Sequence, residues 1–300
     1  MISLFQNEWL MLITGLVVGS IFGSFLNVCA HRIPMGKSII SPRSHCPNCD
    51  QPIPWINNIP FFTWFFQRGR ARCCDFKIPI RYIAMEISSA IVFGYFFYQF
   101  SLHNDLGLTL SGCLLGWILL AVIVIDAENM IIPDRLSMGG ALAGVIFSIL
   151  FPSIHGYGML LVPEGRIISG LESVLGLLIG SSLLFWIGVS AEKILGREAL
   201  GMGDIKLLGC IGAFCGWQAT IFVIFGGAFL GSLVSIPMLL IQSKKRKKSS
   251  VVTDEKEATA FGREIPFGPY LALATILYVV FLKEWIDPWF AKSFFFNDLS

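Results

Sequence analysis

Two aspartates in the chain lie directly beside long uncharged runs. Asp126 follows the run 107–125, and Asp204 comes just before the run 207–243. Acidic side chains at the ends of apolar segments are costly to bury, so they are candidates for a functional site. Two carboxyl groups that share one water can act as general base and general acid, which is aspartic protease chemistry. We therefore name Asp126 and Asp204 as candidate catalytic residues, against the alternative that each is a surface charge.

Two glycines precede the second aspartate. Gly201 and Gly203 come immediately before Asp204 in the chain. Glycine lets a backbone approach a substrate closely and adopts φ angles that other residues avoid. We expect Gly201 and Gly203 to belong to an active-site loop. Asp134 follows Pro133, and we expect it only to cap the helix that begins there.

Four cysteines lie in one stretch between the first two apolar runs. Cys46 and Cys49 form a Cys-x-x-Cys pair, and Cys73 and Cys74 are adjacent to each other. A reducing cytoplasm disfavours disulfides, whereas tetrahedral zinc takes four thiolate or imidazole ligands and stabilises a loop that has little core. We predict a structural zinc site formed by Cys46, Cys49 and Cys74, with Cys73 or His45 as the fourth ligand. The alternative is a set of reduced thiols without a metal.

The composition indicates what kind of fold must position these residues. Hydrophobic residues make up 55% of the 300 residues and charged residues only 14%, and the mean hydropathy is +0.71. Soluble proteins carry about 25% charged residues. The composition excludes a soluble single-domain enzyme, a disordered chain and a collagen-like chain, and it predicts an all-α polytopic membrane protein.

Runs free of Asp, Glu, Lys and Arg mark the predicted transmembrane helices. The longest run, 207–243, would be about 55 Å long as one helix, but the hydrocarbon core is only about 30 Å thick. We therefore divide it at 216–218 into two helices. This gives eight transmembrane helices, of which the other six lie at 9–30, 87–102, 107–125, 136–154, 173–191 and 265–282; the second can extend past Glu86 over 82–85.

The basic residues predict the orientation of these helices. In the eight-helix arrangement, nineteen of the 22 Lys and Arg residues fall on one side, and only Arg166, Lys283 and Lys292 fall on the other. Excess positive charge marks the cytoplasmic side. The large loops and both candidate aspartates therefore face the cytoplasm. We expect the basic run 244–248 to be a solvated topology anchor, with binding to anionic lipid or an acidic partner as the alternative.

The chain thus divides into five predicted parts. Their boundaries follow the ends of the uncharged runs and the position of the cysteines. They are the first transmembrane helix (1–30), a cytoplasmic Cys-rich loop of zinc type (31–81), a second helix with an external turn (82–106), a six-helix aspartic peptidase domain with a cytoplasmic polybasic loop at 243–264 (107–290), and a tail (291–300).

A series of motifs occurs in order along nearly the whole sequence. They are the run 19–28 with His31-Arg32-Ile33-Pro34, Cys46-x-x-Cys49, Arg81-Tyr82 with Glu86, Asp126, Pro133-Asp134, Gly201–Asp204 with Lys206, and Pro266-Phe267-Gly268-Pro269-Tyr270. In these motifs the chain resembles the type IV prepilin peptidase family, membrane aspartic proteases of the Gly-x-Gly-Asp type.

This resemblance implies an activity and a location. Family members cut the basic leader from prepilins and pseudopilins at the cytoplasmic face of the bacterial inner membrane, in pilus assembly, type II secretion or DNA uptake. The catalytic aspartates map to Asp126 and Asp204, and Lys206 joins the active-site loop. Many members then methylate the new N-terminal residue with S-adenosylmethionine, for which we assign no binding residues. The implied partners are prepilins, pseudopilins and the lipid bilayer, with no nucleic acid.

One departure from the family pattern concerns the cysteines. The family's second pair is usually Cys-x-x-Cys, whereas here Ala71 occupies its first position, Cys74 its second, and Cys73 is additional. This departure bears on the zinc site and on the methyltransferase activity. The alternatives that stay open are a peptidase without methyltransferase activity, a membrane transporter or channel, and a non-catalytic scaffold for an assembly machine.

Overall fold

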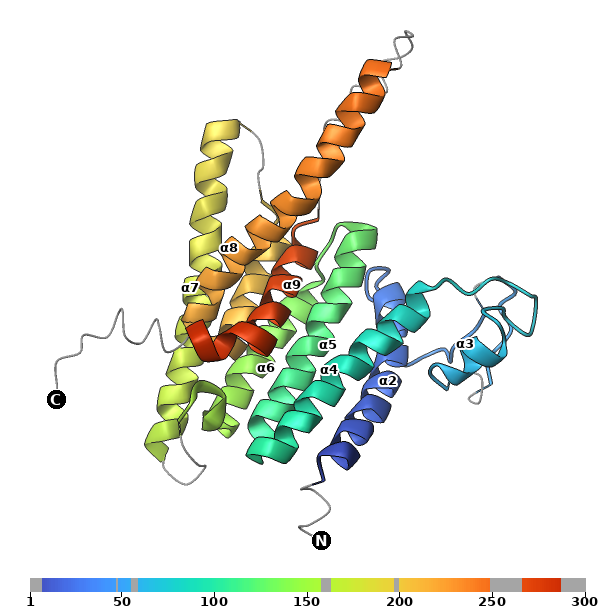
Figure 1. The fold of residues 1–300 in the computed structure, drawn as a ribbon. Helices are drawn as coiled ribbons and strands as arrows, with labels where there is room; N and C mark the ends of the chain where they lie inside the picture. The colour runs from blue at the N-terminus through green and yellow to red at the C-terminus, as the bar shows by residue number, and fades with distance from the viewer. Residues whose placement is uncertain are drawn as a thin grey trace, which may run out of the picture.

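The computed structural model describes residues 7–46, 48–54, 59–157, 163–196, 200–248 and 266–286, without the side chains of 62–63 and 239–248. Helices run side by side in a bundle, and the Cys-rich loop lies at one edge (Figure 1). Within the described ranges there are two isolated β-bridges and no β-strand. The helical elements are α2 (Glu8–Arg32), α3 (Phe62–Phe66), α4 (Arg81–His103), α5 (Leu106–Asn129), α6 (Asp134–Leu150), η2 (Pro152–His155), α7 (Pro163–Leu195), α8 (Met202–Lys248), α9 (Gly268–Leu277) and η4 (Tyr278–Leu282).

Six of these helical segments are long and apolar enough to cross a membrane. They are α2, α4, α5, α7, the part of α8 from Met202 to Met238, and α9 with its continuation to Ile286. Helix α6 has 17 residues, one fewer than this criterion requires. The all-α polytopic membrane fold predicted from the sequence is therefore confirmed.

Helix α8 contains a reversal at Gly216. This residue has φ 83° and ψ 173°, a backbone conformation that interrupts the helix and suits glycine. Gly212 and Thr220 would be about 12 Å apart along a continuous helix. Instead, a Cβ atom on Gly212 would lie 2.8 Å from Cγ2 of Thr220, so the chain folds back on itself. The reversal divides α8 into two limbs, one before and one after Gly216. Six segments meet the criterion for a span; adding α6 and counting the two limbs of α8 separately gives the predicted eight helices among the described residues.

Two predicted boundaries change. The turn between α4 and α5 consists of Asn104 in the left-handed conformation, with φ 52°, and Asp105, whose side chain accepts a hydrogen bond from Leu108 N at 3.0 Å. Helix α5 therefore begins at Leu106, inside the range predicted for the turn. Residues 243–248, which we predicted as the start of a polybasic loop, continue helix α8, and the rest of that loop to 264 lies outside the described residues.

Helices α2 and α4 pack through small residues. A Cβ atom on Gly15, Gly19 or Gly23 would lie 2.5–2.9 Å from backbone atoms of α4. Small residues four positions apart let two membrane helices approach closely, and van der Waals contact then stabilises the pair. The two helices thus form a tight hairpin, and the Cys-rich loop connects them.

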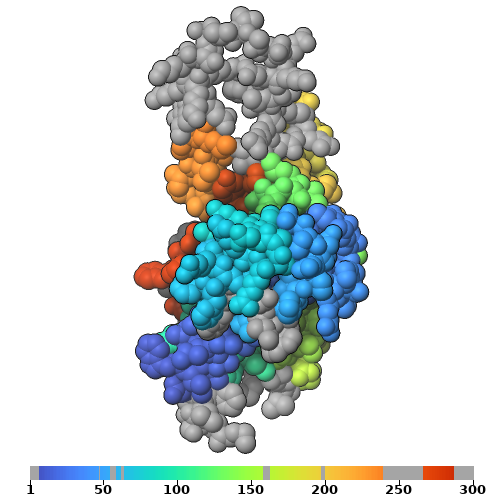
Figure 2. All heavy atoms as spheres, turned by 90° about the vertical axis from the view of Figure 1, so that its right-hand side faces the viewer, coloured from blue at the N-terminus to red at the C-terminus, as the bar shows by residue number. Residues whose placement is uncertain are grey.

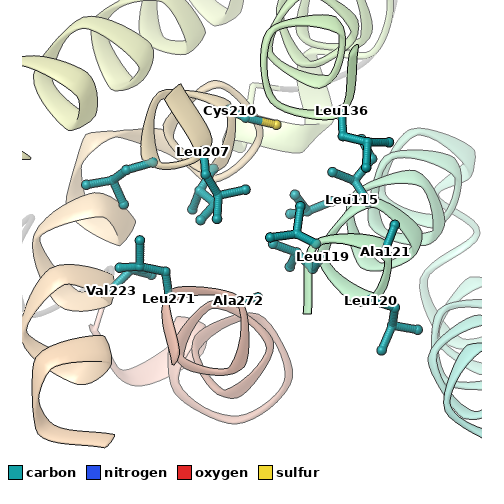
Figure 3. Close-up of a cluster of buried hydrophobic side chains, with 14 of the residues drawn as sticks. Leu115, Leu119, Leu120, Ala121, Leu136, Leu207, Cys210, Val223, Leu271 and Ala272 are labelled. Carbon is teal, nitrogen blue, oxygen red and sulfur yellow. The ribbon is translucent and has the colours of Figure 1, made fainter. Parts of the chain in front are cut away.

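Helix α5 lies at the centre of the bundle. In its apolar window 67% of the residues are buried, against 33% or less in the other five spans. Its leucines pack against side chains of α8 and α9, including Leu207 and Leu271 (Figure 3). This core brings the C-terminal end of α5 next to the N-terminal ends of α8 and α9.

Candidate active site and metal centre

The two candidate aspartates lie at the same end of the bundle. Asp126 is in the last turn of α5, and Asp204 is in the first turn of α8. Their exposed fractions are 5% and 8%. The packing described above brings the two carboxyl groups close enough for their charges to interact. Two buried carboxyl groups from helices far apart in the sequence therefore form one site.

Helix α9 contributes a third group to this site. The backbone N–H of Gly268 donates a hydrogen bond to Oδ2 of Asp126 at 3.1 Å. A Cβ atom at this position would lie 2.7 Å from that oxygen, so a larger residue would displace the carboxyl group. Sequence analysis included Gly268 only within a family motif, because nothing local indicates that α9 begins against the end of α5.

One oxygen of Asp204 has no hydrogen-bond partner among the described residues. This oxygen, Oδ1, is buried. A buried carboxyl oxygen without a partner is costly, and a water or a substrate group would satisfy it. Gly201 leaves room beside the other oxygen, since a Cβ atom there would lie 3.4 Å from Oδ2. A second carboxyl group beside this unpaired oxygen is the pairing that activation of a water by two carboxyl groups requires.

The short connection between α5 and α6 closes the side of the site. Ile132 lies against both glycines: a Cβ atom on Gly203 would be 3.0 Å from its Cβ, and one on Gly268 would be 2.9 Å from its Cδ1. Met130 turns the chain into this connection with φ 56°. The apolar Ile132 side chain therefore lies beside the aspartate site, between Gly203 and Gly268.

The predicted active-site loop is largely helical. Gly201 precedes α8, but Gly203 and Lys206 lie in its first turns, which corrects the prediction that they form a loop. The Lys206 ammonium binds Oδ1 of Asp134 at 2.7 Å and links α8 to the start of α6. Asp134 makes this ion pair in the first turn of α6 instead of acting as the N-cap, the position that Pro133 occupies.

Two contacts join the Cys-rich loop and α4 to the rest of the bundle. Arg81, the first residue of α4, forms an ion pair with Glu128 of α5, two residues beyond Asp126. Glu86 of α4 accepts a hydrogen bond from the backbone N–H of Phe61 at 2.9 Å. Neither partner could be inferred from sequence spacing, because each contact joins segments far apart in the chain that only packing brings together.

The four loop cysteines form a compact cluster. Their sulfur atoms all lie within 4.8 Å of one another, which could hold a metal ion. Hydrogen bonds from the backbone N–H groups of Asn48 and Cys49 lower the pKa of the Cys46 thiol to about 6, so it readily forms the thiolate that binds metals. His45 is directed elsewhere, with its Nε2 4.0 Å from Asp50. The structure thus brings Cys73, rather than His45, to Cys46, Cys49 and Cys74.

Two similar turns position these sulfur atoms. Bridges join His45 to Pro52 in the first turn and Arg70 to Lys77 in the second. Asp50 and Asp75 occupy matching places, with φ 53° and 55°, and their N–H groups bond to the carbonyls of Cys46 and Ala71. Ala71 therefore corresponds to Cys46, and the sulfur missing there is replaced by that of Cys73.

Known proteins resemble the chain along most of its length. Residues 17–100 match the family model for the bacterial peptidase A24 N-terminal domain, and residues 113–236 match that for the type IV leader peptidase family. No solved structure matches the chain.

Curated relatives carry one shared name, prepilin leader peptidase/N-methyltransferase. The protein of Aeromonas salmonicida strain A449 is 30% identical over 89% of both chains, and that of Aeromonas hydrophila is 28% identical over 95% of this chain and 96% of its own. The protein of Klebsiella pneumoniae is 34% identical over 67% of this chain and 83% of its own. The chain therefore belongs to the type IV leader peptidase family.

Proposed function

We propose that this protein cleaves the leader peptide from prepilins and pseudopilins and then N-methylates the new N-terminal residue. The observation that carries the first activity is the pair of buried carboxyl groups, Asp126 and Asp204, at one end of a membrane bundle. The second activity is proposed from the shared name of the curated relatives. S-adenosylmethionine is its proposed methyl donor.

Cleavage would divide the work between the two carboxyl groups. The ionised one removes a proton from a bound water, whose oxygen attacks the scissile carbonyl carbon. The protonated one donates a hydrogen bond to the carbonyl oxygen and then gives its proton to the leaving nitrogen. The Gly268 N–H fixes one oxygen of Asp126. The unpartnered Oδ1 of Asp204 is the natural contact for the water.

The site would face the cytoplasm of the bacterial inner membrane. The excess of Lys and Arg on the loops at the aspartate end supports this orientation. The leader of a substrate waits on that side before export, so the cut requires no transport of the leader. A helical substrate segment must unwind locally before its peptide bond can be attacked between two buried carboxyl groups.

The four cysteines would hold a structural zinc ion. A set of four thiolates suits tetrahedral zinc, and the ion would fix the two turns relative to each other. All four ligands that the cluster offers are thiolates, and they would leave no coordination position open for a water. This is typical of a structural rather than a catalytic zinc site.

The test is a cleavage and methylation assay read by intact mass. Purified protein is incubated with a prepilin and S-adenosylmethionine, beside the variants Asp126→Asn and Asp204→Asn. The expected product has lost its leader and gained about 14 Da, and both variants lose cleavage by about 10²–10⁴-fold. Asp134→Asn is the matched control, because Asp134 is an exposed acid at the same end of the bundle and should leave cleavage intact.

Two results would contradict the proposal. If folded protein cuts none of several prepilins, the transporter or scaffold alternative gains support. If cleavage is normal but the mass gain never appears, the protein is a peptidase without methyltransferase activity.

A further inference from the structure

The short helix α3 exposes two aromatic side chains that take no part in either site. Phe65 and Phe66 are 76% and 73% exposed, and their rings meet edge to face with centroids 6.4 Å apart. The neighbouring Trp64 instead lies against the backbone of Gly69. Large apolar groups clustered on a small surface usually mark an interaction site.

The depth of α3 along the bundle limits what can cover this surface. The chain enters α3 at Phe61, whose N–H bonds to Glu86. Glu86 is five residues, or about 7.5 Å, inside the cytoplasmic end of α4. A headgroup layer is about 5–8 Å thick on each side of the hydrocarbon core. The start of α3 is therefore level with the second turn of α4, at a distance below the end of that helix that matches the thickness of a headgroup layer.

The position of the loop around the bundle agrees with this depth. Helix α3 lies beside α2 and α4, outside the bundle (Figure 1), and the loop covers part of the side of the molecule, with the start of α2 emerging below it (Figure 2). Ile87 and Ile91 are 44% and 60% exposed on α4, a helix long and apolar enough to span a membrane. Exposed apolar side chains therefore occur both on α3 and on the neighbouring apolar span α4.

Basic residues accompany the aromatic pair. Arg68, Arg72 and Lys77 are exposed in the same loop, and Arg70 is paired with Asp75 at 2.6 Å. Aromatic rings at headgroup level with basic side chains beside them are typical of segments that lie in a membrane interface. Anionic headgroups would be attracted by these side chains.

We propose that α3 anchors the Cys-rich loop to the membrane surface, with Phe65 and Phe66 inserted at the boundary between headgroups and acyl chains. The anchor holds the cysteine cluster against the bilayer, beside the α2–α4 hairpin. This inference rests on geometry and exposure and does not depend on the proposed function.

The direct test is photo-crosslinking to lipid. Phe65→benzoylphenylalanine protein is placed in nanodiscs that contain anionic lipid, irradiated and examined by intact mass for lipid adducts. The control is Asp50→benzoylphenylalanine, because the Asp50 side chain is 90% exposed in the same loop. We expect several-fold more lipid adducts at position 65. Equal yields at the two positions would overturn the proposal, as would adducts at position 65 that form only with added prepilin.

A second measurement follows the accessibility of the loop. Phe65→Ser should raise the rate of trypsin cleavage at Arg68 and Arg72 several-fold in nanodiscs, because the loop leaves the surface. In detergent the two proteins should be cut at equal rates, and equal metal content would show that the cysteine cluster is intact. The same change in both media would mean that Phe65 only stabilises the loop. If the variant loses its metal, the crosslinking yield alone decides.

Discussion

The cysteine cluster and the aspartate site bring their reactive groups together by different means, local turns in the first and helix packing in the second. The four sulfur atoms come from residues 46–74, and two local turns with their own backbone hydrogen bonds position them at the surface. The aspartate site takes Asp126, Asp204 and Gly268 from three helices, and buries them through the packing of the whole bundle. The first arrangement should tolerate a changed ligand position, whereas the second should tolerate almost no change in volume.

The largest effect should come from adding volume to the aspartate site. Gly268→Val places atoms where Asp126 Oδ2 and Ile132 now lie, so the carboxyl group must move. We expect prepilin cleavage to fall by about 10²–10⁴-fold, the range for loss of an acid or base group. Gly139→Val is the control, since nothing lies within 4 Å of a Cβ atom there. Equal cleavage by both variants would mean that the contact with Gly268 does not position Asp126.

The cysteine cluster should instead accept a moved ligand. Cys73→Ser removes one sulfur, and we expect bound metal to fall from about one equivalent to less than half, measured by elemental mass spectrometry. Adding Ala71→Cys should restore it, because Ala71 occupies the place in the second turn that Cys46 has in the first. Cys113→Ser, at a buried position in α5, should leave the metal content unchanged. Full metal content in Cys73→Ser alone would remove Cys73 from the ligand set.

The opposite end of the bundle should show an effect of intermediate size on stability. Burial, and then the charge of Lys283, lower the pKa of His155 from 6.5 to about 4. The unfolded protein takes up this proton near pH 6.5 and the folded protein only near pH 4, so stability falls as the pH drops through that window. The loss should reach about 3 kcal/mol.

The variant His155→Gln should remove this pH dependence. Thermal unfolding in detergent from pH 7 to pH 4 measures it, with His103→Gln as the control because His103 is exposed at the end of α4. A wild-type unfolding temperature that does not fall between pH 6.5 and pH 4 would contradict a neutral, buried His155. Because the measurement follows unfolding and not cleavage, it reports the stability of the bundle independently of the aspartate site.

The smallest effect should come from the ion pair at the edge of the aspartate site. Lys206 and Asp134 are both partly exposed, so their coupling should be about 0.2–1 kcal/mol in a double-mutant cycle of Lys206→Met and Asp134→Asn. Cleavage should change little in either variant. A loss comparable to that of Gly268→Val would place Lys206 within the catalytic machinery.

The comparison also explains how much could be predicted from the sequence. The span positions and the reversal near Gly216 followed from helix length and membrane thickness, and the cysteine cluster followed from ligand chemistry. The choice of Cys73 over His45 depended on turn geometry that spacing alone does not specify. The helical state of Gly203 and Lys206 was missed because glycines before an aspartate favour a loop, but α8 begins at Met202. Contacts such as that of Gly268 with Asp126 depend on packing between helices, which no local pattern encodes.

The reversal at Gly216 also bears on how the chain enters the membrane during synthesis. The run 207–243 contains no charge, so its sequence carries no signal that would stop an insertion machine between the two limbs. If the run were threaded as one span, the basic residues 244–248 would be carried to the outer side. Insertion of the two limbs together as a hairpin, with its tip at Gly216, would instead leave those basic residues on the side where α8 begins. The reversal at Gly216 thus also determines on which side of the membrane the loop after α8 lies.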